Sequence, residues 1–90
     1  MKPTLTQDQE AELRKFGRRL AELRKSRGWS QEKLALESGL ARSYLGGVER
    51  GQRNVALLNI LRLSNALSCS PGALFTEYEV TLNQQMMTGE

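Results

Sequence analysis

The sequence predicts an all-α domain of five helices. Apolar residues recur at intervals of three and four along most of the chain, which is the spacing of helices with one buried face. Capping residues precede these stretches and glycines follow them. A chain of 90 residues, 39% of them hydrophobic, forms one small domain with a modest core. We therefore expect a single helical domain over residues 7–75 and a tail over residues 76–90.

The first helix is expected to begin near Gln7 and to stop before Gly28. Thr6 and Gln9 have the spacing of a capping box, in which a hydroxyl and an amide satisfy free N–H groups at the start of a helix. The apolar residues of this helix share one face and are Leu13, Phe16, Leu20 and Leu23. The helix should therefore pack against the core along that face.

Two shorter helices follow. Ser30 is the expected N-cap of the second, which ends at Gly39 after about two turns. A third helix is expected over residues 42–50. The buried stripe of that helix has i, i+4, i+7 spacing and consists of Ala41, Leu45 and Val48. Two short helices joined by a few residues that include a glycine are typical of a helix-turn-helix, whose second helix enters the DNA major groove.

A fourth helix is expected over residues 55–67, with Asn54 as its cap. Its broad apolar face should close the core and consists of Leu57, Ile60, Leu61, Leu63 and Leu67. Ser70 and Pro71 predict a short fifth helix that ends near Phe75, because a cap followed by proline at the first helical position favours a helix start. Leu74 and Phe75 are expected to complete the core.

The tail has two interpretations. Tyr78, Val80 and Leu82 alternate with polar residues, as in a strand, although Leu74, Tyr78 and Leu82 would also align on an extra helix. Its β-branched and aromatic residues favour the strand. Because a lone strand leaves its backbone groups unpaired, we expect Tyr78, Val80 and Leu82 to pair with the same segment of a second subunit.

The charge of the chain is concentrated at its N-terminal side. Residues 1–53 hold 12 Lys/Arg and 7 Asp/Glu, a net charge of +5, whereas residues 54–90 hold 1 and 3, a net charge of −2. An anionic partner would therefore bind the first part.

The chemistry available to the chain is narrow, because it has no histidine and one cysteine. These counts exclude an internal disulfide, a Cys/His metal cluster and a Ser-His-Asp triad. We expect no enzyme activity, no cofactor and no metal. The sequence has no apolar stretch long enough to span a bilayer and no apolar signal core, so we expect a cytoplasmic protein with no membrane partner.

The stretch SQEKLALESGLARSYLGGVERGQRN resembles the Cro/C1-type (XRE-like) helix-turn-helix family of bacterial and phage transcriptional regulators. Its Ser-Gln, Gly-Leu, Tyr-Leu and Glu-Arg-Gly groups stand at the spacings of that family, and the likeness extends over about residues 16–75. Within the family the chain looks most like the controller proteins of restriction-modification systems. The resemblance implies a repressor-like transcription regulator that binds double-stranded DNA as a homodimer at a palindromic operator.

The resemblance also implies residue roles. The base-contacting positions are Arg42, Ser43, Tyr44 and Gly47. The phosphate-contacting positions are Gln31, Arg50, Gln52, Arg53 and Asn54. Arg24 and Glu49 occupy positions that form a partly buried ion pair in the family. Ala41 stands where the family often has Ser or Thr, so a capping hydrogen bond before the third helix is in doubt.

Two adjacent glycines interrupt the third helix, at about 1 kcal/mol each relative to alanine in a helix interior. Gly46 and Gly47 are expected on its exposed arc. Without side chains there, the helix and the DNA could approach closely, leaving Arg42, Ser43 and Tyr44 to read the sequence. The alternative is that both glycines are exposed positions under little constraint.

A second class of function stays open. The same fold could serve as a protein-interaction module, bridging or antitoxin-like, that binds DNA weakly. The basic residues of the third helix and the following loop favour the regulator. Because no residues are left over for an effector-binding domain, regulation is expected to depend on protein concentration, on adjacent DNA sites or on a protein partner.

Overall fold

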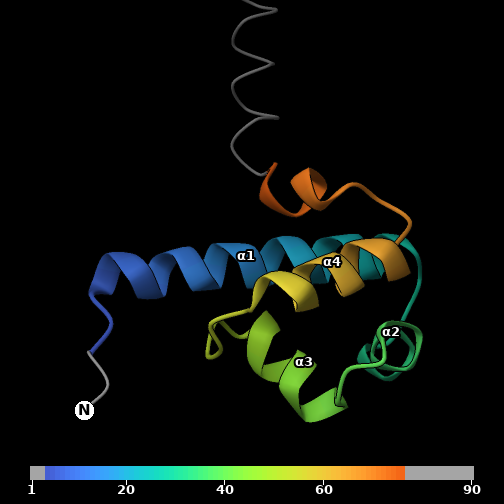
Figure 1. Cartoon of the computed structure of the whole chain (residues 1–90), viewed down its shortest axis with the longest axis horizontal. Coiled ribbons are helices and arrows are strands. Elements are labelled where there is room, and N and C mark those ends of the chain that lie inside the picture. The colour runs from blue at the N-terminus through green and yellow to red at the C-terminus, as the bar shows by residue number, and fades with distance from the viewer. Residues whose placement is uncertain (1–3, 77–90) are drawn as a thin grey trace, which may run out of the picture.

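The computed structural model describes residues 4–76, which form four α-helices and one 3-10 helix and contain no strand (Figure 1). The elements are α1 (Gln7–Ser26), α2 (Gln31–Ser38), α3 (Arg42–Glu49), α4 (Leu57–Ala66) and the 3-10 helix η1 (Pro71–Phe75). The all-α class is thus confirmed for these residues, but the prediction of five α-helices is wrong because the last element is a single 3-10 turn. The tail element expected at Tyr78, Val80 and Leu82 lies outside the described residues.

The first two helices begin as their capping residues predict. The Thr6 hydroxyl accepts from the Gln9 backbone N–H at 3.0 Å, and the Gln9 side-chain oxygen accepts from the Thr6 N–H at 2.8 Å, which completes a capping box. The Ser30 hydroxyl accepts from the Lys33 N–H at 3.1 Å at the start of α2. Gly39 ends α2 with φ +74°, a left-handed conformation that favours glycine.

The start of α4 differs from the prediction. This helix begins at Leu57, and its N-cap is Ala56, whose side chain makes no capping hydrogen bond. Asn54 is therefore not the cap. The chain is extended at Ala56, and the preceding Val55 packs against the core, so the segment before Leu57 is held outside the helix.

The core receives side chains from every element. Its fully buried members are Leu20, Leu34, Leu45, Val48, Leu63 and Leu74. α1 packs against α3 and η1, and α2 packs against α3 and α4, so these leucines and the valine meet in one cluster. No helix within residues 4–76 is long and apolar enough to cross a membrane.

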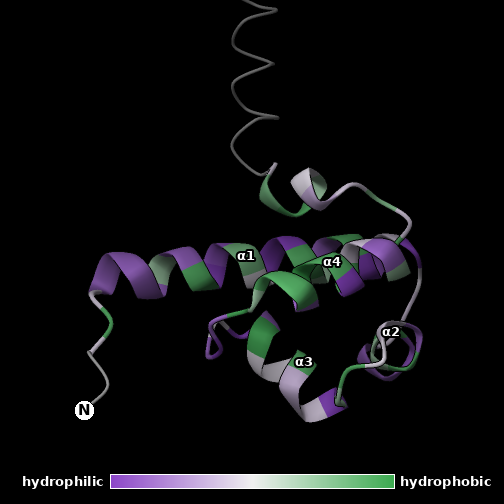
Figure 2. Ribbon diagram, viewed as in Figure 1, coloured by the Kyte–Doolittle hydropathy of each residue, from purple (hydrophilic) through white to green (hydrophobic). Residues whose placement is uncertain are grey.

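Three residues expected in the core are instead exposed. Leu57 is 68% exposed, Leu61 40% and Phe75 56%. The face of α4 that turns inward carries Leu63 and Leu67, and a ten-residue helix with one buried face leaves the leucines beside it in solvent. Figure 2 shows that hydrophobic residues are frequent in the first part of α4.

A close approach between α1 and α3 depends on Gly17. This buried glycine of α1 faces the end of α3, where an added Cβ would overlap the carbonyl oxygens of Val48 and Glu49 and lie 2.8 Å from the Glu49 carbonyl carbon. These neighbours are backbone atoms, which cannot rotate away. Only glycine lets α1 and α3 come this close.

We expect Gly17→Ala to lower the free energy of unfolding by about 1–3 kcal/mol, because the new methyl group has to push α3 away from α1. Urea denaturation followed by circular dichroism measures the change. The matched control is Gly72→Ala, since the nearest atom to a Cβ at Gly72 is the Ser70 hydroxyl at 3.8 Å. Equal stability of the two variants would contradict the close approach.

Candidate nucleic-acid interface

α2 and α3 form a helix-turn-helix. Residues 39–41 join the two helices, and the left-handed Gly39 sets the turn between them (Figure 1). Leu45 and Val48 bury the inner face of α3, while Arg42 and Ser43 at its start are exposed. The Ala41 side chain makes no capping hydrogen bond. The first turn of α3 therefore presents an arginine and a hydroxyl to solvent.

An ion pair fixes the end of α3 against α1. Arg24 Nε and Nη2 donate to the two carboxylate oxygens of Glu49 at 2.7 and 3.0 Å. The side chains are only 10% and 6% exposed. Arg24 Nη1 also donates to the Trp29 carbonyl oxygen at 2.8 Å, which anchors the segment before α2. The predicted Arg24–Glu49 pair thus exists and holds three segments together.

The hydrogen bonds that Arg24 donates to the Glu49 carboxylate raise the pKa of Arg24, and this effect outweighs the lowering by burial. A raised pKa means that the favourable charge on Arg24 is fully present at neutral pH and would be lost only as the pH rises through that raised value.

Gln31 is joined to the same carboxylate. Its Nε2 donates to Glu49 Oε1 at 2.8 Å, and Gln31 is the first residue of α2. A helix N-terminus favours an anion, so the residue predicted to contact phosphate stands where a phosphate would be stabilised. The hydrogen bond to Glu49 fixes the orientation of the Gln31 side-chain amide in the free protein.

Tyr44 is placed differently from the other predicted base-contacting residues. It is half-buried and packs against the core, and its hydroxyl accepts from Asn59 Nδ2 at 3.1 Å. The hydroxyl therefore faces α4, whereas Arg42 and Ser43 are exposed. Tyr44 fixes α3 relative to α4, a contact that the sequence motif does not reveal because its partner lies 15 residues away.

Gly46 and Gly47 are buried, so the expectation that they lie on an exposed arc is wrong. Arginine side chains cover them. A Cβ at Gly46 would lie 3.1 Å from Arg50 Nη1, and one at Gly47 would lie 3.0 Å from Arg53 Cγ. Helical periodicity did not predict this burial, because the atoms that cause it come from long side chains folded back across the helix.

The loop after α3 packs tightly against α1. Gly51 has φ +76°, and a Cβ there would lie 2.8 Å from the Arg14 Cα. The Gln52 N–H donates to the Gly47 carbonyl oxygen at 2.8 Å, and Arg50 Nε donates to the Gln52 side-chain oxygen at 3.1 Å. The exposed Arg50, Gln52 and Arg53 are therefore held beside the C-terminal end of α3.

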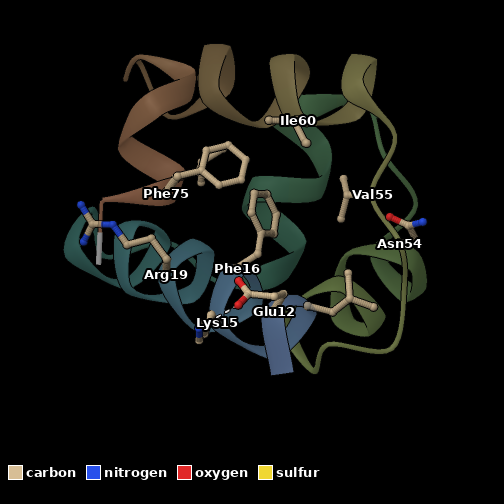
Figure 3. A pocket seen from close by; sticks show the side chains of 10 residues that line it. Glu12, Lys15, Phe16, Arg19, Asn54, Val55, Ile60 and Phe75 are labelled. Atoms are coloured by element: carbon tan, nitrogen blue, oxygen red, sulfur yellow. Dashed lines mark hydrogen bonds and ion pairs between the residues drawn. The ribbon is translucent and has the colours of Figure 1, made fainter. Parts of the chain in front are cut away.

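Asn54 lies on a different surface from the α3 residues. It lines a groove of about 260 Å³ whose other residues come from α1, Val55, α4 and η1, with none from α2 or α3 (Figure 3). Phe16 and Phe75 face each other in this groove, with ring centroids 5.3 Å apart. The groove is therefore separate from the candidate DNA-binding face.

Residues that the sequence analysis did not single out complete the site. Gly17, Arg14 and Asn59 position α3 and its loop by contacts with α1 and α4. For Gly17 a signal was available, since a glycine inside a strongly patterned helix usually has a packing reason. The other two offered no local signal.

The fold and this exposed face define a helix-turn-helix domain. Residues 20–74 match the family described as Helix-turn-helix (HTH_3), and the chain belongs to this Cro/C1-type family. Such relatives are regulators rather than enzymes.

Relatives within the family include control proteins of restriction-modification systems. The solved controller protein C.AhdI from Aeromonas hydrophila is 64% identical, with a TM-score of 0.71 over 71% of this chain and 97% of that chain. Control protein C.BamHI from Bacillus amyloliquefaciens is 47% identical over 57 residues, 62% of this chain and 70% of that protein. The controller protein C.Esp1396I, solved as a tetramer in complex with its natural 35 base-pair operator, is 32% identical, with a TM-score of 0.65 over 70% of this chain and 83% of that chain.

We expect Glu49→Gln to lower the free energy of unfolding by about 3 kcal/mol, because it leaves the Arg24 charge buried without its carboxylate. The matched control is Glu37→Gln. Its ion pair with Lys33 is 42–47% exposed, so the loss should stay below about 1 kcal/mol. Urea denaturation of both variants measures the difference, and similar losses would show that the buried pair is not special.

Proposed function

We propose that the protein is a sequence-specific transcriptional regulator that binds a palindromic operator as a homodimer, with α3 in the major groove. The observation that carries this proposal is the exposed face of α3, where Arg42 and Ser43 are free of the core and Arg50 and Arg53 fold back toward the helix. An arginine can donate two hydrogen bonds to guanine O6 and N7, and a serine can bond to several bases.

The distribution of charge supports DNA as the partner. The first turn of α3 has no acidic residue, and its one carboxylate, Glu49, is held inward by Arg24 and Gln31. The surface beside α3 therefore carries positive charge without a competing carboxylate from that helix. Such a surface is attracted to the phosphate backbone.

Contacts with phosphates would position the protein on the duplex. Gln31 at the start of α2 and Arg50 and Gln52 after α3 flank the exposed residues of α3 on both sides. We propose these three residues as backbone contacts and leave out Asn54, which lines the separate groove beside α1. They fix orientation and carry no base information.

The homodimer is proposed from the uncovered side of α4. Leu57, Leu58 and Leu61 are 40–68% exposed. Leu61 lies four residues after Leu57 and three after Leu58, so it shares one side of the helix with both. A contiguous exposed apolar patch marks an interaction site. Two copies joined here would present two copies of α3, as two half-sites about 34 Å apart require. The structure of C.Esp1396I is a tetramer on its operator, which supports assembly in this family.

The tail is proposed as a second part of the interface. Tyr78, Val80 and Leu82 would add to the leucines of α4, so that residues 76–90 extend the dimerisation element of the 7–75 domain. A protein-interaction module that binds DNA weakly would use the same leucines for another partner. The positive face of α3 favours the regulator over this alternative.

The experiment that tests the proposal is selection of bound duplexes from a random pool, followed by mobility-shift titration of the enriched site and a scrambled site. We expect a two-fold symmetric sequence bound at least 1,000-fold more tightly than the scrambled one, as for specific DNA-binding proteins. If the selected duplexes share no common sequence, the proposal of a sequence-specific regulator is refuted. The protein-interaction module then remains.

We expect Arg42→Ala to weaken operator binding by about 1–3 kcal/mol and to flatten base preference at one base pair per half-site, because one forked contact with a base is lost. Mobility shifts with single-base variants of the operator measure both effects. Arg18→Ala, at an exposed arginine of α1, is the matched control and should keep the preference. Unchanged discrimination by Arg42→Ala would remove this residue from the readout.

We expect Leu58→Glu to shift the monomer–dimer equilibrium toward monomer by at least 10-fold, because a carboxylate cannot be buried unpaired in an apolar interface. Analytical ultracentrifugation across micromolar concentrations measures the shift. The control is Leu36→Glu, because Leu36 is the exposed leucine of α2, with 75% of its surface in solvent.

Deletion of residues 77–90 in the same assay separates the two parts of the interface. Dissociation on deletion with no effect of Leu58→Glu would assign the dimer to the tail alone.

A further inference from the structure

The side chain of Arg53 crosses α3. A Cβ at Gly47 would lie 3.0 Å from Arg53 Cγ, 3.7 Å from Cδ and 3.4 Å from Nε. These are three successive atoms of one side chain, so its middle lies flat on the helix and its guanidinium begins there. Arg53 is itself exposed, although it buries Gly47 beneath it.

Gly47 lies on the same side of α3 as the exposed Ser43. The two residues are four positions apart, one turn of the helix. One turn after Ser43, this side of α3 therefore has no side chain of its own. The side chain of Arg53 from the loop covers it instead. The Gln52 N–H bonds to the Gly47 carbonyl oxygen at 2.8 Å, which holds the loop close enough for this crossing.

Two more arginines lie near the adjacent Gly46. Arg42 Nη1 and Arg50 Nη1 lie 3.5 and 3.1 Å from the place of a Cβ at Gly46. The Gln31 side-chain oxygen is also there, 3.6 Å from the place of that Cβ, and Arg50 Nε donates to the Gln52 side-chain oxygen at 3.1 Å. With Arg53 over the neighbouring glycine, three guanidinium groups converge on two residues. Positive charges gathered on one face attract an electronegative partner.

We propose that Arg53 is a base-reading residue whose guanidinium contacts a guanine in the major groove, with Gly47 as the bare surface that lets it cross α3. This inference rests on the proposed function and replaces the phosphate contact expected for Arg53 from the family resemblance. A guanidinium carried over the exposed face can make the forked contact with guanine O6 and N7. A phosphate contact would need only its charge.

The test is to measure binding of every single-base operator variant by the wild type, Arg53→Lys, Arg53→Ala and Gly47→Ala. Arg53→Lys keeps the charge but loses the fork, so it should flatten preference at one base pair per half-site by about 10-fold or more. The preference read by Arg42 should stay.

Gly47→Ala tests the crossing itself. Its methyl group would lie 3.0 Å from Arg53 Cγ and should displace the side chain, flattening the same base pair as Arg53→Lys. The double variant should show no further flattening, because both changes remove one contact. Gly72→Ala, where the nearest atom to the new methyl group is the Ser70 hydroxyl at an ordinary contact distance of 3.8 Å, is the control and should bind as the wild type does.

Three outcomes decide the inference. Flattening of one shared base pair by Arg53→Lys and Gly47→Ala supports it. Uniform weakening by Arg53→Ala at all variants, with a salt slope smaller by about 1 per subunit and normal preference in Arg53→Lys, would assign Arg53 to a phosphate and overturn it. Absence of any base preference in the wild type would overturn the proposed function itself. Thermal unfolding of each variant confirms that it is folded, and Arg53→Lys decides the question if Gly47→Ala is not.

Discussion

The arrangement of the domain depends on the carboxylate of Glu49. It receives hydrogen bonds from Arg24 of α1 and Gln31 of α2 while it stands at the end of α3. One buried group thereby fixes three helices. An apolar contact would stabilise the packing of these helices only in proportion to the buried area. Hydrogen bonds have defined directions, so they also fix the orientation of α3 relative to α1 and α2.

The same interaction governs the electrostatics of the exposed face. A carboxylate at the end of α3 would repel phosphates if it pointed outward. Its pairing with Arg24 satisfies it inside the domain and leaves the arginines of α3 and the following loop without an acidic neighbour on that helix. Stability and affinity for an anionic partner therefore have a common origin here, since one ion pair orders the fold and determines which charges remain outside.

Glycines make close packing around this centre feasible. Gly17 brings α1 onto the backbone of α3, and Gly51 brings the loop onto the backbone of Arg14. Gly47 has a different role, because it accommodates the side chain of Arg53 from the loop instead of a neighbouring backbone. A small domain has few large side chains to bury, so close backbone approach supplies part of the packing that larger cores obtain from volume.

The sequence by itself determined what local chemistry decides: the capping box at Thr6, the start of α2 at Ser30, and the burial of Leu45 and Val48 in α3. Ala41, expected in the same buried stripe, is exposed because it precedes the first turn of α3. The ion pair of Arg24 and Glu49 followed from the family resemblance. Only the tertiary structure decided the remaining features. The Tyr44 hydroxyl bonds to Asn59, and arginine side chains cover Gly46 and Gly47. α4 begins at Leu57, and both Leu57 and Phe75 are exposed. Periodicity identifies the side of a helix that is apolar, but it carries no information about neighbours distant in sequence. Long side chains and loops therefore determine the final burial, because their positions depend on contacts that exist only after the helices have packed.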